Sequence, residues 1–506
     1  MKPLRLATSF ASVSILIALA PAVAQSQGHG CAEGAAGLGD RYFPTYGNGG
    51  YDVRRYDLDV VYRPATDRLR GRASIRARAK RRLCSFNLDF VGLEVGEVKV
   101  DRRQARWRRD DHELTVLPAR PLKRGERFEV VVRYAGVPVG SGLSGFMRTE
   151  DGANVAGQPE AAATWFPVND HPLDKASYSF DVTVPNGYEV VANGRPRGRD
   201  RSPGGMTTWR WRAGKMASYL ATIDVGEWDV RRWRTEGGIP VYDAVDSALT
   251  GGLRDEIDSS LARQEEMLDV LTPSFGPYPF NALGGIVDNQ SNLFFALETQ
   301  TRPVYSKYFW LNSQGEPTNG DFVVVHELAH QWFGDDVALA RWRDIWLNEG
   351  FATYAEWLWT EDQGGPTPRA TFQQLYDAIP TNDPFWSLRI GDPGADRLFD
   401  DEVYVRGAMA AQALRNEIGR ADFFRLLRKW TSSKSGGNGT TGQFIALAEQ
   451  VSGEQLDDLF EAWLYTPAKP ETSQISGGTG RGDARRSAAG GWLEVVQQRL
   501  RRHGRY

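Results

Sequence analysis

The sequence predicts a multidomain α+β protein, with an antiparallel β domain first and a mostly helical domain after it. The chain has 506 residues, which is too many for a single hydrophobic core. From about residue 51 to 230, apolar residues recur with a period of two, as in half-buried strands. After about residue 250 they recur with helical spacing. The change of period near 228–250 therefore marks a domain boundary.

The first half reads as strands separated by turns. Apolar and polar residues alternate in YDLDVVY (56–62), ASIRARAK (73–80) and RFEVVVRY (127–134). SYSFDVTVPNGYEVVANG (177–194) is typical of two strands on either side of a Pro-Asn-Gly turn. Alternation with Gly and Pro between the runs favours antiparallel strands that bury one face. We therefore assign residues 25–230 to a β domain.

The second half reads as helices. SALTGGLRDEIDSSLARQEEMLDVL (247–271) has helical spacing. Further helical segments are expected at 321–333, 344–363, 404–418, 421–430 and 441–450. Asp344 is a candidate N-cap for the second of these. We assign residues 231–470 to this helical domain.

Both ends of the chain differ from the rest. Residues 1–24 combine an early positive charge, a short apolar run and an Ala-Val-Ala site, which predicts a signal peptide cut near Gln25. The alternative, a membrane anchor, is disfavoured because the run is short for a span. Residues 471–506 are rich in Gly and Arg and predict a flexible basic tail. We expect a secreted or extracytoplasmic protein in the cell envelope or periplasm.

The composition and charge of the chain limit the kinds of binding partner that we expect. The net charge of −3 gives no reason to expect nucleic acid. No later segment is long and apolar enough for stable membrane insertion. The two cysteines, Cys31 and Cys84, can form one disulfide in an oxidising compartment, and the sequence leaves that pairing open. Oligomeric state is not readable from the sequence.

The stretch HELAHQWFGDD (326–336) predicts a metal site. His326 and His330 are four residues apart, so they share one face of a helix and can converge on one ion. A catalytic zinc takes three protein ligands and leaves one position open. Glu349, eighteen residues after His330 in a second helical segment, is the candidate third ligand. Zn²⁺, one per chain, suits these ligands, though Mn or Co can occupy them.

Glu327 lies next to the first histidine and is placed to act as a general base toward a zinc-activated water. HELAH, eighteen residues and then the Glu of WLNEGFATYAE resemble the M1 family of zinc aminopeptidases, gluzincins with a thermolysin-like catalytic domain. QPEAAATWFPVNDHPLDKASY and LFEAWLYTPAKP are similar to the family too, so the resemblance covers roughly residues 40–470. It implies a β-sandwich-like first domain, a small sheet in the catalytic domain, and a short form without the family's large helical C-terminal domain.

The resemblance also implies roles for residues outside the metal motif. Tyr404 in VYVRG is similar to the family's catalytic tyrosine, which stabilises the oxyanion, but Arg406 stands where the family's motif has Lys. Glu298 takes the place of the glutamate that binds the substrate's free amine. Gln158 and Glu160 resemble the family's Gln-x-Glu element, which lines the first specificity pocket and helps to bind the amine.

The amine-binding loop departs from the family pattern. Phe295, Leu297 and Thr299 stand where the family has Gly, Met and Asn, so we expect this loop to contact the substrate backbone differently. Candidates to orient the histidines are Asn348, Asp344 and Glu356. Tryptophans near the motif are expected in the core: Trp332, Trp342, Trp346, Trp357 and Trp359.

The sequence as a whole favours a zinc aminopeptidase acting on peptides with a free N-terminus. An endopeptidase or an epoxide-hydrolase-like relative would use the same metal site on substrates without a free amine. A non-catalytic peptide-binding protein would be expected to lack a ligand, the base or the oxyanion donor, whereas the sequence has a candidate for each.

Overall fold

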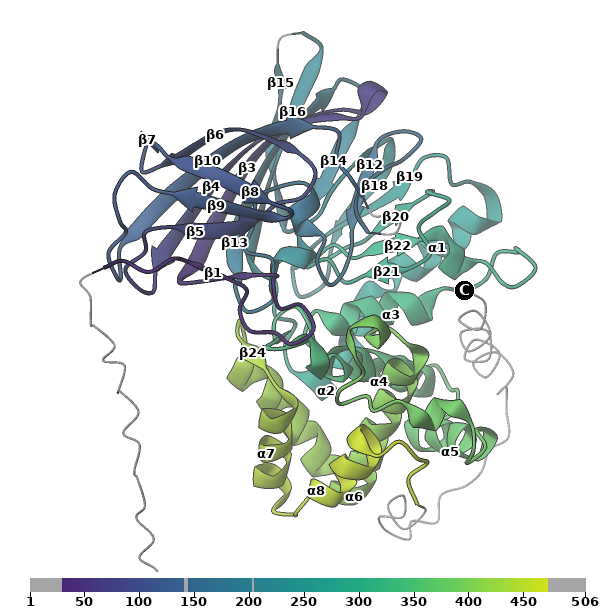
Figure 1. Cartoon of the computed structure of the whole chain (residues 1–506). Helices are drawn as coiled ribbons and strands as arrows, with labels where there is room; N and C mark the ends of the chain where they lie inside the picture. The colour runs from purple at the N-terminus through teal and green to yellow at the C-terminus, as the bar shows by residue number, and fades with distance from the viewer. Residues whose placement is uncertain (1–29, 141–143, 203, 472–506) are drawn as a thin grey trace, which may run out of the picture. The chain divides into compact units, whose positions relative to one another are not determined.

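The computed structural model describes residues 30–140, 144–202 and 204–471 (Figure 1). The predicted signal peptide lies outside these residues, as does the predicted basic tail except for Glu471. Within the described ranges no helix combines the length and apolarity needed to cross a membrane. Neither cysteine is a free thiol, because Cys31 and Cys84 are both disulfide-bonded.

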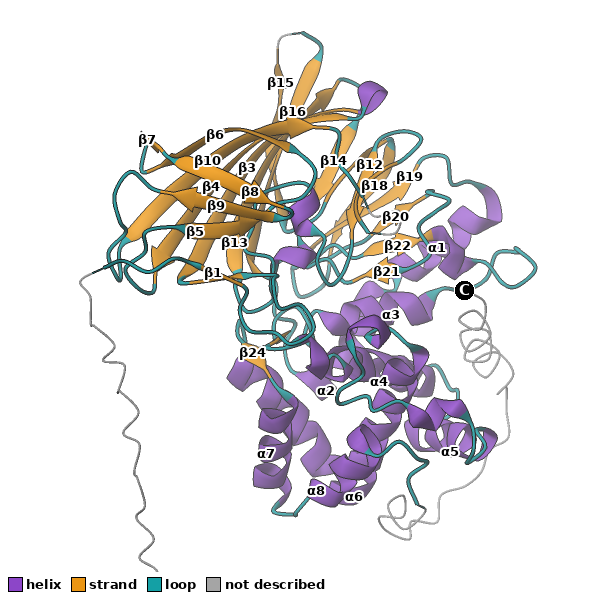
Figure 2. Cartoon of the chain, in the orientation of Figure 1, coloured by secondary structure: helices purple, strands orange, loops and turns teal. Residues whose placement is uncertain are grey.

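Strands fill the N-terminal half and helices most of the C-terminal half, as predicted (Figure 2). The largest sheet in the described part of the chain has eight strands. In spatial order they are β15 (Arg195–Ser202), β16 (Met206–Met216), β13 (Ala176–Pro185), β3 (Tyr51–Arg63), β4 (Arg68–Ala79), β10 (Arg127–Gly136), β6 (Glu94–Val100) and β7 (Arg103–Gln104). The alternating residues predicted to be apolar and inward, such as Tyr56, Leu58 and Val60, are buried in the core.

The β domain also contains the two-stranded sheet of β1 (Ala35–Ala36) and β2 (Asn48–Gly49) and two further small sheets. One contains β5 (Phe86–Asp89), β9 (Glu113–Leu117) and β8 (Arg106–Asp110). The other contains β11 (Gly145–Arg148), β12 (Ala153–Ala156), β17 (Ile223–Gly226) and β14 (Glu189–Ala192).

One pairing departs from the expected antiparallel pattern. β13 lies parallel to β3, because the chain between them passes through the smaller sheets and returns to the large sheet in the same direction. The two strands expected around Pro185 both form, but β13 stays in the eight-stranded sheet whereas β14 joins the four-stranded sheet.

The second domain begins with a sheet that supports the site. Its spatial order is β18 (Trp228–Arg234), β19 (Pro240–Asp246), β20 (Ile286–Asp288), β22 (Val304–Ser306) and β21 (Ala296–Leu297). Strand β21 is therefore at the edge of this sheet, and Glu298 follows it directly.

The described residues form eight α-helices. They are α1 (Gly251–Ala262), α2 (Gln264–Phe275), α3 (Asp321–His330), α4 (Trp346–Asp362), α5 (Pro368–Ala378), α6 (Asp401–Lys434), α7 (Thr441–Ser452) and α8 (Asp457–Phe460). The segments expected at 404–418 and 421–430 form the single span α6, with a non-helical break at Gly419. Helix α5 was not predicted. The five tryptophans expected in the core are all buried.

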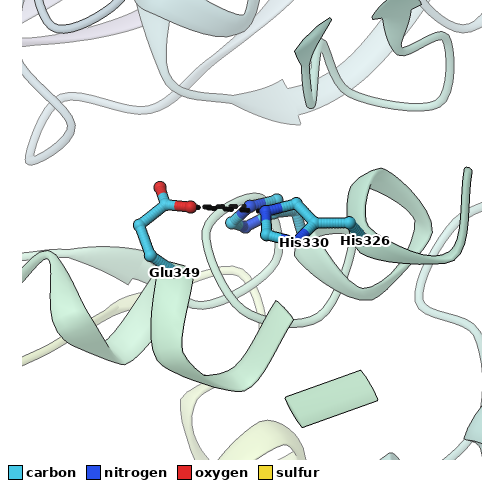
Figure 3. A group of neighbouring side chains, drawn as sticks. All are labelled: His326, His330 and Glu349. Carbon is cyan, nitrogen blue, oxygen red and sulfur yellow. Dashed lines mark ion pairs between the residues drawn. The ribbon is translucent and has the colours of Figure 1, made fainter. Parts of the chain in front are cut away.

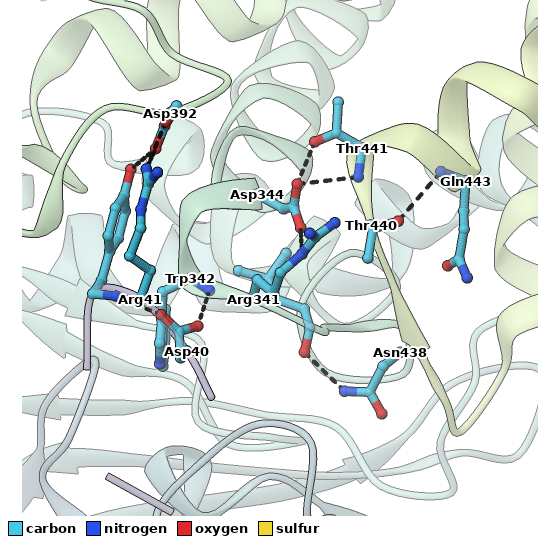
Figure 4. A network of polar contacts seen from close by, with 12 residues as sticks. Asp40, Arg41, Arg341, Trp342, Asp344, Asp392, Asn438, Thr440, Thr441 and Gln443 are labelled. Carbon is cyan, nitrogen blue, oxygen red and sulfur yellow. Dashed lines mark hydrogen bonds and ion pairs between the residues drawn. The ribbon is translucent and has the colours of Figure 1, made fainter. Parts of the chain in front are cut away.

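Asp344 does not cap α4. It lies in a 3₁₀ turn (Trp342–Asp344), and α4 begins at Trp346 without a side-chain cap. The Asp344 carboxylate instead accepts hydrogen bonds from the backbone N–H and hydroxyl of Thr441, at 3.2 and 2.7 Å (Figure 4). It thereby ties the start of α4 to the start of α7.

Candidate metal centre and substrate cleft

Two helices bring the predicted ligands together. His326 and His330 lie on one face of α3, and Glu349 lies in the first turn of α4 (Figure 3). Glu349 Oε2 lies 3.4 Å from His326 Nε2 and 3.3 Å from His330 Nε2. All three side chains are buried. One carboxylate oxygen and two imidazole nitrogens within reach of one point form the donor set expected for zinc.

The turn after α3 depends on a glycine. Gly334 has φ of 133°, and a Cβ there would lie 3.2 Å from Asn348 Nδ2 and 3.5 Å from His330 Nδ1. The left-handed region accepts glycine readily and other residues poorly. This turn lets the chain reverse between the two helices that carry the ligands.

The outer nitrogens of the two histidines are held by acceptors. His326 Nδ1 lies 2.7 Å from Glu356 Oε1, and His330 Nδ1 lies 2.9 Å from the Phe333 carbonyl oxygen. Both acceptors favour the proton on Nδ1, so both Nε2 lone pairs point at the ligand position. The residues therefore fit a zinc ion. Of the three candidates to orient the histidines, Glu356 is the one that contacts a ring nitrogen.

Close approach of α4 and α6 brings Tyr404 to the metal ligands. A Cβ at Gly350 would lie 2.8 Å from the Gly407 carbonyl carbon, so neither glycine leaves room for a side chain. Tyr404 lies one turn before Gly407, and its ring centroid is 5.9 Å from that of His326. Gly350, which follows Glu349, and Gly407 of the VYVRG motif thus pack directly against each other.

The candidate amine-binding carboxylate is close to the metal ligands. Glu298 is 2% exposed, and its carboxylate lies within 4.8 Å of a ring nitrogen of His330 and a carboxylate oxygen of Glu327. Its Oε1 accepts hydrogen bonds from Gln158 Nε2 at 3.2 Å and from the Tyr219 hydroxyl at 3.0 Å. Sequence reasoning missed Tyr219, because nothing local distinguishes it from other tyrosines of the β domain.

Only one residue of the predicted Gln-x-Glu pair lies at the cavity that contains Glu298. Gln158 reaches Glu298, but Glu160 does not line the cavity that contains Glu298. Burial, and after it the nearby charge of Asp170, raises the pKa of Glu160 to about 7. The two residues on either side of Pro159 therefore have different surroundings, which their spacing in the sequence does not reveal.

These groups line one cavity of about 270 Å³. Its lining includes Gln158, Glu298, the three metal ligands, Glu327 and Tyr404, with apolar walls from Phe294, Phe295, Ala296, Phe309, Val323 and Phe399. A larger hollow of about 660 Å³ over residues 288–292 contains none of the catalytic candidates, so chemistry and not size identifies the site. Of the three departures in the amine-binding loop, only Phe295 lines the cavity.

The comparisons with known proteins agree with this geometry. Residues 53–220 match the Peptidase M1 N-terminal domain family, and residues 277–463 match the Peptidase family M1 domain. The fold is similar to the crystal structure of an M1 zinc metallopeptidase from Deinococcus radiodurans, with a TM-score of 0.75 and 29% identity over 86% of this chain and 99% of that one. The chain belongs to peptidase family M1. Membership of a zinc peptidase family and the fit of His326, His330 and Glu349 make zinc the cofactor.

Curated relatives of this M1 chain are longer. Leucyl aminopeptidase of Saccharolobus solfataricus is 25% identical over 450 residues, which cover 83% of this chain and 54% of the relative. Aminopeptidase M1-D of Oryza sativa is 26% identical over 461 residues, which cover 82% of this chain and 50% of the relative. The chain thus spans about half the length of these relatives.

Proposed function

We propose that this M1 peptidase is a zinc aminopeptidase that removes N-terminal residues from peptides. The position of Glu298 carries the proposal. In a peptide the free α-amine and the first carbonyl are two bonds apart, and Glu298 lies within 4.8 Å of His330, a metal ligand. A substrate ammonium bound to Glu298 therefore puts its first peptide bond at the metal. The relatives named as aminopeptidases, and a Deinococcus radiodurans M1 mutant crystallised with a Tyr-Ser-Ala substrate, support this proposal.

Zinc, when bound by His326, His330 and Glu349, supplies Lewis-acid chemistry that acidifies the attacking water and polarises the scissile carbonyl. Glu327 acts as the general base, because it follows a ligand on α3 and lines the cavity. Its Oε2 has no hydrogen-bond partner among the described residues, and burial raises the pKa of Glu327 to about 7. Glu327 takes the proton of the water and then transfers it to the leaving amine.

Tyr404 stabilises the oxyanion that forms when water adds to the carbonyl. Its side chain is half-buried, lines the cavity and stands beside the His326 ring. A phenol hydroxyl aimed at a developing negative charge lowers the barrier without changing the ground state much. Tyr404→Phe should lower kcat by about 100-fold or more and leave the melting temperature unchanged.

The amine requirement is tested with aminoacyl chromogenic substrates beside their N-acetylated forms. The parent should cut only the free-amine substrates and lose this activity when a zinc chelator is added. Glu298→Gln keeps the shape and removes the charge, and should lower kcat/KM by about 100-fold or more because it leaves an ammonium unpaired. Glu316→Gln, at an exposed loop position, is the matched control. Equal cleavage of acetylated substrates would instead establish an endopeptidase.

We further propose that the enzyme acts outside the cytoplasm. The signal-peptide pattern of residues 1–24 and the disulfide-bonded state of both cysteines support this location. N-terminal sequencing of the protein recovered from the extracytoplasmic fraction should begin near Gln25. Recovery in the cytoplasm with Met1 retained would refute the proposed export.

A further inference from the structure

A second group of metal-binding residue types lies in the β domain. Asp89, the last residue of β5, is directly opposite Glu113, the first residue of β9, in the antiparallel pair. Directly opposed residues place their side chains on the same face of a sheet, so these two carboxylates face each other. Like charges in that position repel unless a cation or a proton lies between them.

Three of the four carboxylate oxygens of Asp89 and Glu113 lack a donor among the described residues. Asp89 is fully buried, and its Oδ2 accepts hydrogen bonds from the backbone of Gly47 and Asp170 and from the Asn48 amide. Its Oδ1 has no hydrogen-bond partner within the described ranges, and neither has either carboxylate oxygen of Glu113. An unpaired buried carboxylate is costly, so such a group requires a positive partner or a proton.

His112 completes the group. One of its ring nitrogens lies within 4.8 Å of a carboxylate oxygen of Asp89 and of Glu113. Nε2 is 3.1 Å from the Thr45 carbonyl oxygen, which can only accept, and Nδ1 is 3.1 Å from an Asp111 carboxylate oxygen. A ring that donates Nε2–H to the Thr45 carbonyl keeps a lone pair on Nδ1, and this nitrogen would bind a metal in place of its contact with Asp111.

We propose that Asp89, His112 and Glu113 form a second metal site, for a divalent transition-metal cation such as Zn²⁺. Two carboxylates and one imidazole are a donor set that suits such a cation. The Asp89 side chain is fully buried, and the rings of His112 and Tyr46 stack with their centroids 4.5 Å apart.

A series of hydrogen bonds connects the proposed site to Glu298, the candidate amine-binding carboxylate. Asp170 donates its backbone N–H to Asp89, and its own carboxylate accepts from the Ser218 hydroxyl at 2.8 Å. The next residue, Tyr219, donates to Glu298. A cation at Asp89 would therefore fix the segment that holds Glu298. This consequence rests on the proposed aminopeptidase function, whereas the metal site itself does not.

The test counts zinc in the full-length protein after loading with Zn²⁺ and removal of unbound metal. The parent should hold two zinc ions per chain, and Glu113→Gln should hold one. Glu94→Gln, an exposed position on β6, is the matched control and should hold two. His326→Ala should also hold one ion, and its combination with Glu113→Gln should hold none. These counts do not depend on any peptidase assay.

A second measurement covers the case in which Glu113→Gln folds poorly. In the His326→Ala background, added Zn²⁺ should raise the melting temperature, because a ligand that binds only the folded state stabilises it. The rise should disappear when Asp89→Asn is added. One zinc ion in both the parent and Glu113→Gln, with no rise in the His326→Ala background, would mean that protons neutralise the cluster and would overturn the proposal.

Discussion

The hydrogen bonds of Arg406 explain why this chain has arginine where the family motif has lysine. They also allow a quantitative test. The side chain is fully buried and donates five hydrogen bonds to backbone carbonyls. The acceptors are the carbonyl oxygens of Trp386, Leu388, Ala462, Trp463 and Thr466. The guanidinium thereby fastens two separate segments to α6, two residues after Tyr404.

Arg406→Lys should destabilise the protein despite keeping the charge. An ammonium has three donors, so at least two of the five carbonyls lose their partner. Each buried carbonyl left unsatisfied costs about 1–3 kcal/mol, which gives about 2–6 kcal/mol in total. Urea unfolding followed by tryptophan fluorescence measures this loss, and kcat should fall too as Tyr404 shifts.

The control for this substitution is Arg425→Lys. Arg425 is exposed on the same helix and donates to a single backbone carbonyl, that of Val451. An exposed change of this kind should alter the free energy of unfolding by no more than about 0.5 kcal/mol. If Arg406→Lys were as mild as Arg425→Lys, the reasoning from donor count would be wrong.

Three further substitutions test the surroundings of the site. Glu356→Gln weakens the acceptor at His326 Nδ1 and should lower zinc affinity about 10- to 100-fold, measured by competition with a chelator. Tyr219→Phe removes one donor to Glu298 and should raise KM about 10-fold with little change in kcat, as steady-state kinetics will show. Burial lowers the pKa of Lys175 to about 8, so between pH 8 and 10 the unfolded chain binds more protons than the native one. Unfolding titrations should therefore find the parent gaining about 1 kcal/mol of stability per pH unit relative to Lys175→Met, and a flat difference would refute that pKa.

The sequence was most informative where function depends on short spacings along one element. His326 and His330 are fixed four residues apart by the helix itself, and Glu349 follows on the next helix, so the ligand set was predictable. Alternation likewise predicted strands such as β3 and β4, because burial on one face imposes a period of two.

Contacts between distant segments were not predictable in the same way. Asp344 looked like a helix cap, but Thr441, almost a hundred residues later, offers it two donors. The acceptor for His330 is the backbone carbonyl of Phe333, and the residue type at position 333 gives no indication of this contact. The parallel pairing of β13 with β3 depends on the path of the chain through other sheets, which local periodicity does not encode.

The β domain supplies two hydrogen-bond donors to Glu298. Gln158 and Tyr219 come from the region that matches the N-terminal domain family, whereas Glu298 comes from the region that matches the catalytic one. Both donors bind Oε1, which leaves Oε2 for a substrate group. A carboxylate held by two donors keeps one orientation, so a substrate amine meets a preformed partner and loses less entropy on binding. Under the proposed aminopeptidase function, both domains therefore contribute to recognition of the substrate amine, although the three metal ligands all lie in the region that matches the catalytic domain.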